Sequence, residues 1–195
     1  MRIAVIGAGL SGLSFAHSSR GFADIQLFEK SRGVGGRLAP RRAADYEFDH
    51  GAQFFTCRSK SLKSLLKNDD FQSAVSEWQP KLVTLAPDSE TFKRTWFEPH
   101  YVGAPSMTAF PRRLARGLAI SYSTRVRKIS RCGNGWQLKD ENGSELGAHT
   151  GGGQDINFWF IVAAKIQQPI STQGTARRSI GLHLACDRIR YHPSA

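Results

Sequence analysis

Residues 3–12 read Ile-Ala-Val-Ile-Gly-Ala-Gly-Leu-Ser-Gly, and this stretch decides the fold. Its four leading apolar residues predict a short strand that is buried on both faces. The pattern from Leu10 to Arg20 predicts a helix that ends at Gly21. Residues 25–29, Ile-Gln-Leu-Phe-Glu, predict a second strand. The order strand, glycine loop, helix and strand predicts a βαβ unit at the start of an α/β domain.

The glycine loop has the G-x-G-x-x-G spacing that is typical of dinucleotide-binding sites. Gly7 allows the tight turn, Gly9 lets the backbone approach a pyrophosphate, and Gly12 lets the helix pack on the strand. Glu29 lies seventeen residues after Gly12, at the end of the second strand, where a carboxylate accepts hydrogen bonds from ribose hydroxyls. The same carboxylate repels a 2′-phosphate, so the residues disfavour NADP and leave NAD and FAD open.

A second glycine-rich segment follows at once, with residues 30–37 reading Lys-Ser-Arg-Gly-Val-Gly-Gly-Arg. Its backbone can approach the same pyrophosphate at Gly36, and the Arg37 guanidinium can neutralise the phosphate charge. With this segment the sequence resembles the flavoprotein amine oxidase superfamily, whose FAD site pairs the opening βαβ unit with a GGR segment. The resemblance implies FAD as the cofactor.

Three further segments narrow the resemblance to the renalase family, and within it to the bacterial renalase-like proteins. Residues 48–56 read Phe-Asp-His-Gly-Ala-Gln-Phe-Phe-Thr, residues 101–107 read Tyr-Val-Gly-Ala-Pro-Ser-Met, and residues 124–129 read Thr-Arg-Val-Arg-Lys-Ile. The similarity covers residues 1–147 and, more weakly, residues 158–164. It implies a Rossmann-like FAD/NAD(P)-binding domain of the p-hydroxybenzoate hydroxylase type, a partial α+β substrate domain, and FAD held without a covalent bond.

The motifs and the resemblance together predict the cofactor contacts of this chain. These are Gly7, Gly9, Ser11, Gly12, Glu29, Gly36, Arg37, Gln53, Phe54 and Val126. In the family, aberrant reduced forms of NAD(P)H transfer a hydride to the flavin, and oxygen reoxidises the flavin to give peroxide. The resemblance therefore implies an FAD-dependent oxidoreductase with a reduced nicotinamide-type or amine substrate. Because the flavin carries this chemistry, the sequence assigns no catalytic residue.

The pattern along the chain predicts a discontinuous FAD-binding domain over residues 1–56 and 100–165, a partial substrate domain over 57–99, and an atypical tail over 166–195. Apolar spacing predicts helices over 59–66 and 71–78, the second capped by Asp69 and stopped by Pro80. Further predictions are a hairpin over 81–97, a helix over 106–117, and strands over 124–131, 135–139 and 158–164.

Beyond residue 147 the sequence departs from the family. Residues 148–155 form a glycine-rich stretch, and no segment after Ala164 matches the family's C-terminal FAD segment. We therefore expect a truncated chain. The alternative to an enzyme is a truncated, non-catalytic remnant that binds FAD or ADP without turnover.

The net charge of +11 raises nucleic acid as a third possibility. The basic residues favour solvated helix faces instead, because they recur at helical spacing without interleaved aromatic residues. They are Lys60, Lys63 and Lys67, and Arg112, Arg113 and Arg116. No apolar run approaches the roughly 20 residues of a membrane span, and no signal peptide is evident. We expect a cytoplasmic protein with a small-molecule substrate and neither a nucleic-acid nor a membrane partner.

The remaining reactive or aromatic residues are interpreted as structural. Cys57, Cys132 and Cys186 are far apart and form no CxxC motif, which predicts neither a disulfide framework nor a metal site. His50 is interpreted as a packing or backbone-bonding residue, and His17 as a solvated residue of the first helix. Trp78 and Trp96 are interpreted as packing groups.

Overall fold

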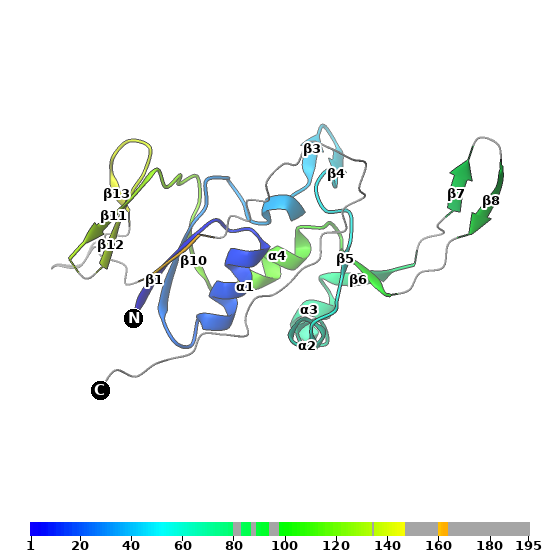
Figure 1. Ribbon diagram of the computed structural model, residues 1–195, viewed down its shortest axis with the longest axis horizontal. Helices are drawn as coiled ribbons and strands as arrows, with labels where there is room; N and C mark the ends of the chain where they lie inside the picture. The colour runs from blue at the N-terminus through cyan, green and yellow to red at the C-terminus, as the bar shows by residue number, and fades with distance from the viewer. Residues whose placement is uncertain (80–82, 87–88, 94–97, 134, 147–159, 164–195) are drawn as a thin grey trace.

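The computed structural model describes residues 1–79, 83–86, 89–93, 98–133, 135–146 and 160–163 (Figure 1). The predictions for Trp96, Cys186, the glycine-rich stretch and the tail over 166–195 lie outside the described residues.

A four-stranded parallel sheet forms the centre of the nucleotide-binding part. Its strand order is β10 (Ala119–Ser121), β2 (Asp24–Phe28), β1 (Arg2–Ile6) and β14 (Phe160–Ala163). Val5 of β1 pairs with Leu27 on one side and with Val162 on the other. The predicted strands over 3–6, 25–29 and 158–164 are thus confirmed with slightly shifted bounds. Strand β10 was not predicted, because it has only three residues and no long apolar run.

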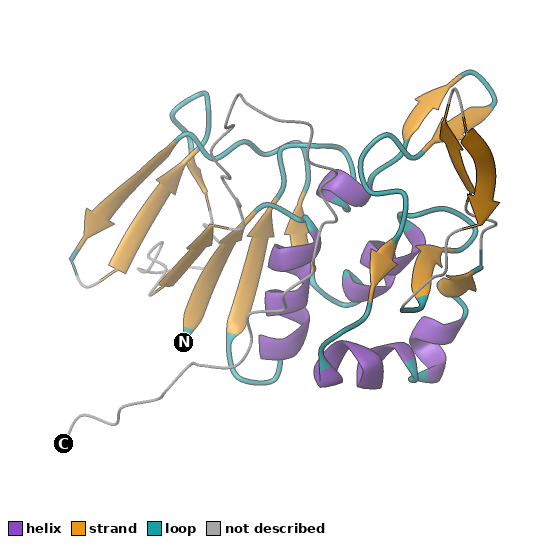
Figure 2. Ribbon diagram, turned by 45° about the vertical axis from the view of Figure 1, so that its right-hand side comes forward, coloured by secondary structure: helices purple, strands orange, loops and turns teal. Residues whose placement is uncertain are grey.

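Two layers cover the central sheet, one on each side (Figures 1 and 2). The helices α1 (Leu10–Ser19) and α4 (Ala109–Leu114) share one hydrophobic cluster, in which Leu13 and Phe110 are fully buried. On the other side, Leu138 packs against Ala4 and Phe28. Leu138 belongs to an antiparallel sheet in the order β11 (Lys128–Cys132), β12 (Gly135–Lys139) and β13 (Glu145–Leu146).

A smaller antiparallel sheet lies beside this sandwich. It has the order β5 (Phe55–Thr56), β9 (His100–Gly103) and β6 (Val75–Trp78), and the helices α2 (Lys60–Leu66) and α3 (Asp69–Gln72) lie next to it. Two hairpins complete the described structure. They are β3 (Arg41–Ala43) with β4 (Tyr46–Phe48), and β7 (Val83–Ala86) with β8 (Ser89–Lys93). The second confirms the predicted hairpin.

The predicted helix over 71–78 is wrong. Helix α3 ends at Gln72, and Val75–Trp78 forms β6, which pairs antiparallel with β9. A β-branched valine and a tryptophan suit a strand once a partner strand is available, and the spacing of Phe71, Val75 and Trp78 did not reveal that partner. The predicted strand over 124–131 also begins later, at Lys128. Thr124 instead donates its backbone N–H to the carbonyl of Glu29.

The predicted helices over 10–20, 59–66 and 106–117 are confirmed as α1, α2 and α4, although α4 is only six residues long. Ser59 caps α2, since its side chain accepts a hydrogen bond from the Leu62 N–H. Across the described residues, no helix has the length and apolar character that crossing a membrane requires.

Candidate nucleotide-binding site

The first glycine loop joins β1 to α1. Gly7 has a φ of +100°, a conformation that favours glycine, and its N–H donates to the Phe28 carbonyl at 2.9 Å. Gly9 is the N-cap of α1 and supplies no side-chain cap. The first N–H groups of a helix have no acceptor within the helix, and the helix dipole adds a partial positive charge there. This end of α1 can therefore bind an anionic group.

The second glycine loop lies directly against the first. The Gly35 N–H donates to the Ala8 carbonyl at 2.9 Å, and Gly9 and Gly35 form a parallel β-bridge. Gly36 has a φ of +56°, and a Cβ atom on it would lie 3.1 Å from the Cα atom of Gly9. The two glycine motifs, which the sequence separates by more than twenty residues, thus meet backbone against backbone.

Glu29 stands at the end of β2 with only 7% of its surface exposed. One carboxylate oxygen accepts a hydrogen bond from the Ala8 N–H at 2.6 Å, and the other accepts one from the Ser31 N–H at 2.8 Å. These two hydrogen bonds from backbone N–H groups were not predicted from the sequence, which indicated only a ribose contact for Glu29. Each carboxylate oxygen can accept more than one hydrogen bond, so capacity for ribose hydroxyls remains.

Residues 36–38 form a short 3₁₀ helix, η1 (Gly36–Leu38), on which a third segment rests. The Ala52 N–H donates to the Arg37 carbonyl at 2.9 Å, and a Cβ atom on Gly51 would overlap that carbonyl oxygen. Gln53, which is exposed, and Phe54, which is half-buried, follow directly. The predicted residues Arg37, Gln53 and Phe54 therefore belong to one continuous region beside the glycine loops.

Phe54 belongs to an aromatic group on the small sheet. Its ring centroid lies 4.5 Å from that of His100 and 5.9 Å from that of Trp78. The structure thus confirms Trp78 as a packing group, although 41% of its surface is exposed. The aromatic group was not predicted, because its members come together only through the register of β5, β9 and β6.

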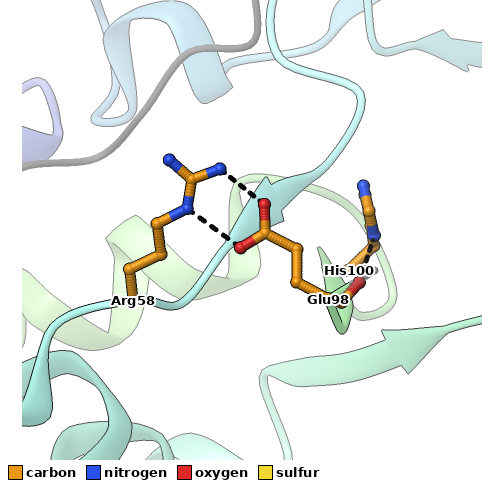
Figure 3. A network of polar contacts seen from close by, with 3 residues as sticks. All are labelled: Arg58, Glu98 and His100. Atoms are coloured by element: carbon orange, nitrogen blue, oxygen red, sulfur yellow. Dashed lines mark hydrogen bonds and ion pairs between the residues drawn. The ribbon is translucent and has the colours of Figure 1, made fainter. Parts of the chain in front are cut away.

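An ion pair lies next to this aromatic group (Figure 3). The Arg58 Nε–H donates to one Glu98 carboxylate oxygen at 2.9 Å, and its Nη2 donates to the other. The hydrogen bond from Arg58 lowers the pKa of Glu98, and the same bond raises the pKa of Arg58. His100 Nδ1 lies 2.9 Å from the Glu98 carbonyl oxygen. Since a carbonyl oxygen only accepts, Nδ1 carries the proton in this contact.

The remaining predicted contacts lie in α1, in η1 and on the opposite face of the central sheet. Ser11 is exposed in the first turn of α1, where Gly12 is buried, and Arg37 is exposed in η1. Val126 is half-buried on the other side of the central sheet, packed against the cluster of Ala4, Phe28 and Leu138. Val126 therefore lies on the opposite face of the sheet from α1. It follows Thr124, whose backbone N–H donates to the Glu29 carbonyl.

The interpretation of His17 as a solvated residue is wrong. Its ring meets Phe71 edge-on at 5.7 Å, and its Nδ1 is buried without a hydrogen-bond partner. Burial lowers the pKa of His17, and the positive charge of Arg20 lowers it further. His50 is exposed, and its backbone N–H donates to the Phe48 carbonyl.

The cysteines that the structure describes form no disulfide. Cys57 packs against the main hydrophobic cluster, and burial raises the pKa of its thiol, whereas Cys132 is exposed. Within the described part of the chain, no three His, Cys, Asp or Glu side chains are grouped as metal ligands would be.

Comparisons with known proteins agree with this geometry. Residues 5–68 match the family model of the NAD(P)-binding Rossmann-like domain. These residues include both glycine loops, Glu29 and the segment with Gly51, Gln53 and Phe54. The fold is therefore α/β with a Rossmann-like NAD(P)-binding domain, as the sequence predicted.

Several solved structures share the fold at low sequence identity. A protein from Photorhabdus luminescens subsp. laumondii, assigned as an FAD-containing monooxygenase, is 16% identical over 84% of this chain, with a TM-score of 0.56. A protein from Exiguobacterium sp., assigned as a protoporphyrinogen oxidase, is 12% identical over 83%, with a TM-score of 0.59. An engineered putrescine oxidase is 13% identical over 74%, also with a TM-score of 0.59. This chain spans 39%, 58% and 56% of those chains, respectively.

Proposed function

We propose that this chain binds FAD and belongs to an FAD-dependent oxidoreductase of the amine oxidase type, with a renalase-like specificity. The observation that carries the proposal is the contact between Gly9 and the Gly35–Gly36 loop at the amino end of α1. A Cβ atom on Gly36 would lie 3.1 Å from the Gly9 Cα atom, so glycine at Gly36 allows the two loops to approach this closely. The backbone of Gly9, Gly35 and Gly36 then forms a cradle that can accept a diphosphate. The fold shared with flavoenzyme structures supports the same cofactor.

The residues present fit the two halves of FAD. The N–H groups at the start of α1, near Ser11, and the Arg37 guanidinium would hold the pyrophosphate, and Glu29 would hold the adenosine ribose. Gln53 and Phe54 would contact the flavin half, and Val126 would contact the adenine. The bound flavin would accept a hydride from a reduced nicotinamide-type or amine substrate. This chain's own residues bind and orient the cofactor.

In this proposal the FAD-binding domain comprises residues 1–56 and 100–165, and the substrate part comprises residues 57–99. It places the protein in the cytoplasm with a small-molecule substrate and no nucleic-acid or membrane partner. A second candidate is a non-catalytic remnant that binds FAD or ADP without turnover.

A binding experiment tests the site. Purified protein is titrated with FAD and with ADP by calorimetry, together with Arg37→Ala and with Arg32→Ala as the matched control. Both arginines are exposed residues of the same segment, but the proposal gives only Arg37 a contact with the phosphates. Loss of a charge-assisted bond to phosphate predicts about tenfold weaker binding or more for Arg37→Ala. Equal binding by all three proteins overturns the assignment of Arg37.

A turnover experiment separates the two candidates. Flavin-loaded protein is mixed with reduced nicotinamide isomers under air. Bleaching of the flavin with release of peroxide supports the enzyme, and stable yellow protein without peroxide supports the remnant. Absence of FAD and ADP binding, with DNA affinity that falls steeply as salt rises, supports the nucleic-acid interpretation instead.

A further inference from the structure

The sheet of β5, β9 and β6 has two different faces. Phe55 and Tyr101 stack on the face that turns to the main core, where Phe55 is 2% exposed. Side chains alternate along a strand, so Phe54 and His100 project from the other face. Trp78 pairs with His100 in the sheet and joins them there. This outer face therefore presents three rings, and His100 is the one that belongs to the middle strand of the sheet.

His100 is the most constrained member of the three. It lies on the middle strand, paired with Thr56 on one side and with Trp78 on the other, and it is 8% exposed. Its Nδ1–H is committed to the Glu98 carbonyl, which sets the rotation of the ring. Its ring centroid lies 4.5 Å from that of Phe54, at the close end of the 4.5–7 Å range of aromatic contact.

The Arg58–Glu98 ion pair continues the pairing of β5 with β9 beyond the ends of the two strands. Because Thr56 pairs with His100, Arg58 and Glu98 stand opposite each other two residues further along. Their two hydrogen bonds hold the strand ends at the point where the chain leaves β5 and returns to β9 (Figure 3). Glu98 is thus fixed by its side chain while its carbonyl fixes His100.

We propose that His100 is a positioning residue for the flavin ring and acts through Phe54. The proposal rests on the proposed function, which places Phe54 against the flavin half of FAD. Phe54 is half-buried and follows the Gly51–Ala52 segment, which is hydrogen-bonded to η1. Its ring contacts the rings of His100 and Trp78, and the His100 ring is the nearer of the two. His100 itself makes no contact with the cofactor in this arrangement.

Two variants separate the ring of His100 from its hydrogen bond. His100→Asn keeps an N–H donor toward the Glu98 carbonyl and removes the ring, whereas His100→Phe keeps a ring and removes the donor. Phe54→Leu and the double variant Phe54→Leu with His100→Asn complete a cycle. Tyr101→Phe is the control, since it lies on the opposite face of the same strand and keeps its stacking on Phe55.

The readout is the visible circular dichroism of bound FAD, with FAD and ADP affinities measured on every variant. The ADP titration shows that each variant folds, because the adenosine half of the site lies elsewhere. We expect His100→Asn to change the flavin spectrum as Phe54→Leu does, with FAD affinity altered less than about threefold. The double variant should match Phe54→Leu, and Tyr101→Phe should match the unaltered chain.

The outcomes are distinguishable. If the unaltered chain binds no FAD, the proposed function fails and this proposal fails with it. If FAD binds but its spectrum is the same in His100→Asn and in the unaltered chain, only the role of His100 is overturned. If the spectral changes caused by the two single substitutions simply add in the double variant, the role of His100 is overturned as well. If His100→Asn binds no ADP, it has not folded, and His100→Phe takes its place. A flavin spectrum of His100→Phe that is identical to that of the unaltered chain then confirms that an aromatic ring at this position is sufficient.

Discussion

The Glu29 carboxylate accepts a hydrogen bond from the Ala8 N–H at 2.6 Å, which ties the end of β2 to the glycine loop that follows β1. The second carboxylate oxygen accepts from the Ser31 N–H and so holds the start of the second glycine segment. One buried acid therefore organises both loops, in addition to the ribose contact proposed for it. The shape of the cradle and its preference for a ligand depend on the same side chain.

Replacing Glu29 by glutamine should weaken both stability and nucleotide binding. The amide oxygen can still accept one of the two backbone hydrogen bonds, but the NH₂ group then faces a backbone N–H. An unsatisfied buried donor costs about 1–3 kcal/mol of unfolding free energy. Urea unfolding measures this cost, and calorimetric titration with ADP and FAD should show weaker binding. An unchanged unfolding midpoint would show that the two hydrogen bonds contribute nothing to the fold.

Gly36→Ala should impair the cradle, because Gly36 has a φ of +56° and its new Cβ would approach the Gly9 Cα at 3.1 Å. The left-handed conformation alone costs about 1–2 kcal/mol for an alanine. Gly33→Ala is the matched control in the same segment, since a Cβ atom there meets nothing within 4 Å. Weaker FAD and ADP binding by Gly36→Ala than by Gly33→Ala is the expected result. Equal affinities would argue against close backbone approach at this site.

The opening βαβ unit was predictable because its signals are local. All the signals lie within the first thirty residues: the apolar run of β1, the glycine spacing and the acid after β2. Each can be assigned a role from its neighbours in the sequence alone. Strand β6 was not predictable in this way. Its pairing with β9 joins Val75 to Gly103, and nothing near Val75 indicates a partner so far along the chain. Tertiary pairing decided between helix and strand there.

The same distinction between local sequence signals and long-range pairing applies to the candidate site. Glycine spacing predicted which loops would bind phosphate, and Gly35 could have been added to the predicted contacts from its place in the G-x-G-G run. The contact of Phe54 with His100 and the pair of Arg58 with Glu98 depend on the register of β5 and β9. A sequence alone does not specify that register, so these partners were missed.

Gly51→Ala should disturb the second glycine loop from outside it. A Cβ atom on Gly51 would overlap the carbonyl oxygen of Arg37, the same oxygen that accepts from Ala52. We expect η1 to shift, with a loss of about 1–3 kcal/mol of unfolding free energy and weaker FAD binding. Gly21→Ala is the control, because a Cβ atom there meets nothing within 4 Å. Chemical unfolding and FAD titration measure both effects, and equal values for the two variants would contradict the overlap.

His17 should make the fold less stable in acid. Burial of the His17 ring, which meets Phe71 edge-on, and the nearby charge of Arg20 lower the pKa of His17 below its ordinary value of 6.5. The unfolded chain then takes up the proton first, so this contribution to stability is present above pH 6.5 and is lost as the pH falls from 6.5 through the lowered pKa. His17→Phe removes the titration and keeps a ring against Phe71, so its urea midpoint should fall less than that of the unaltered chain between pH 7.5 and pH 5. Parallel profiles for His17→Phe and the unaltered chain would show that another group is responsible.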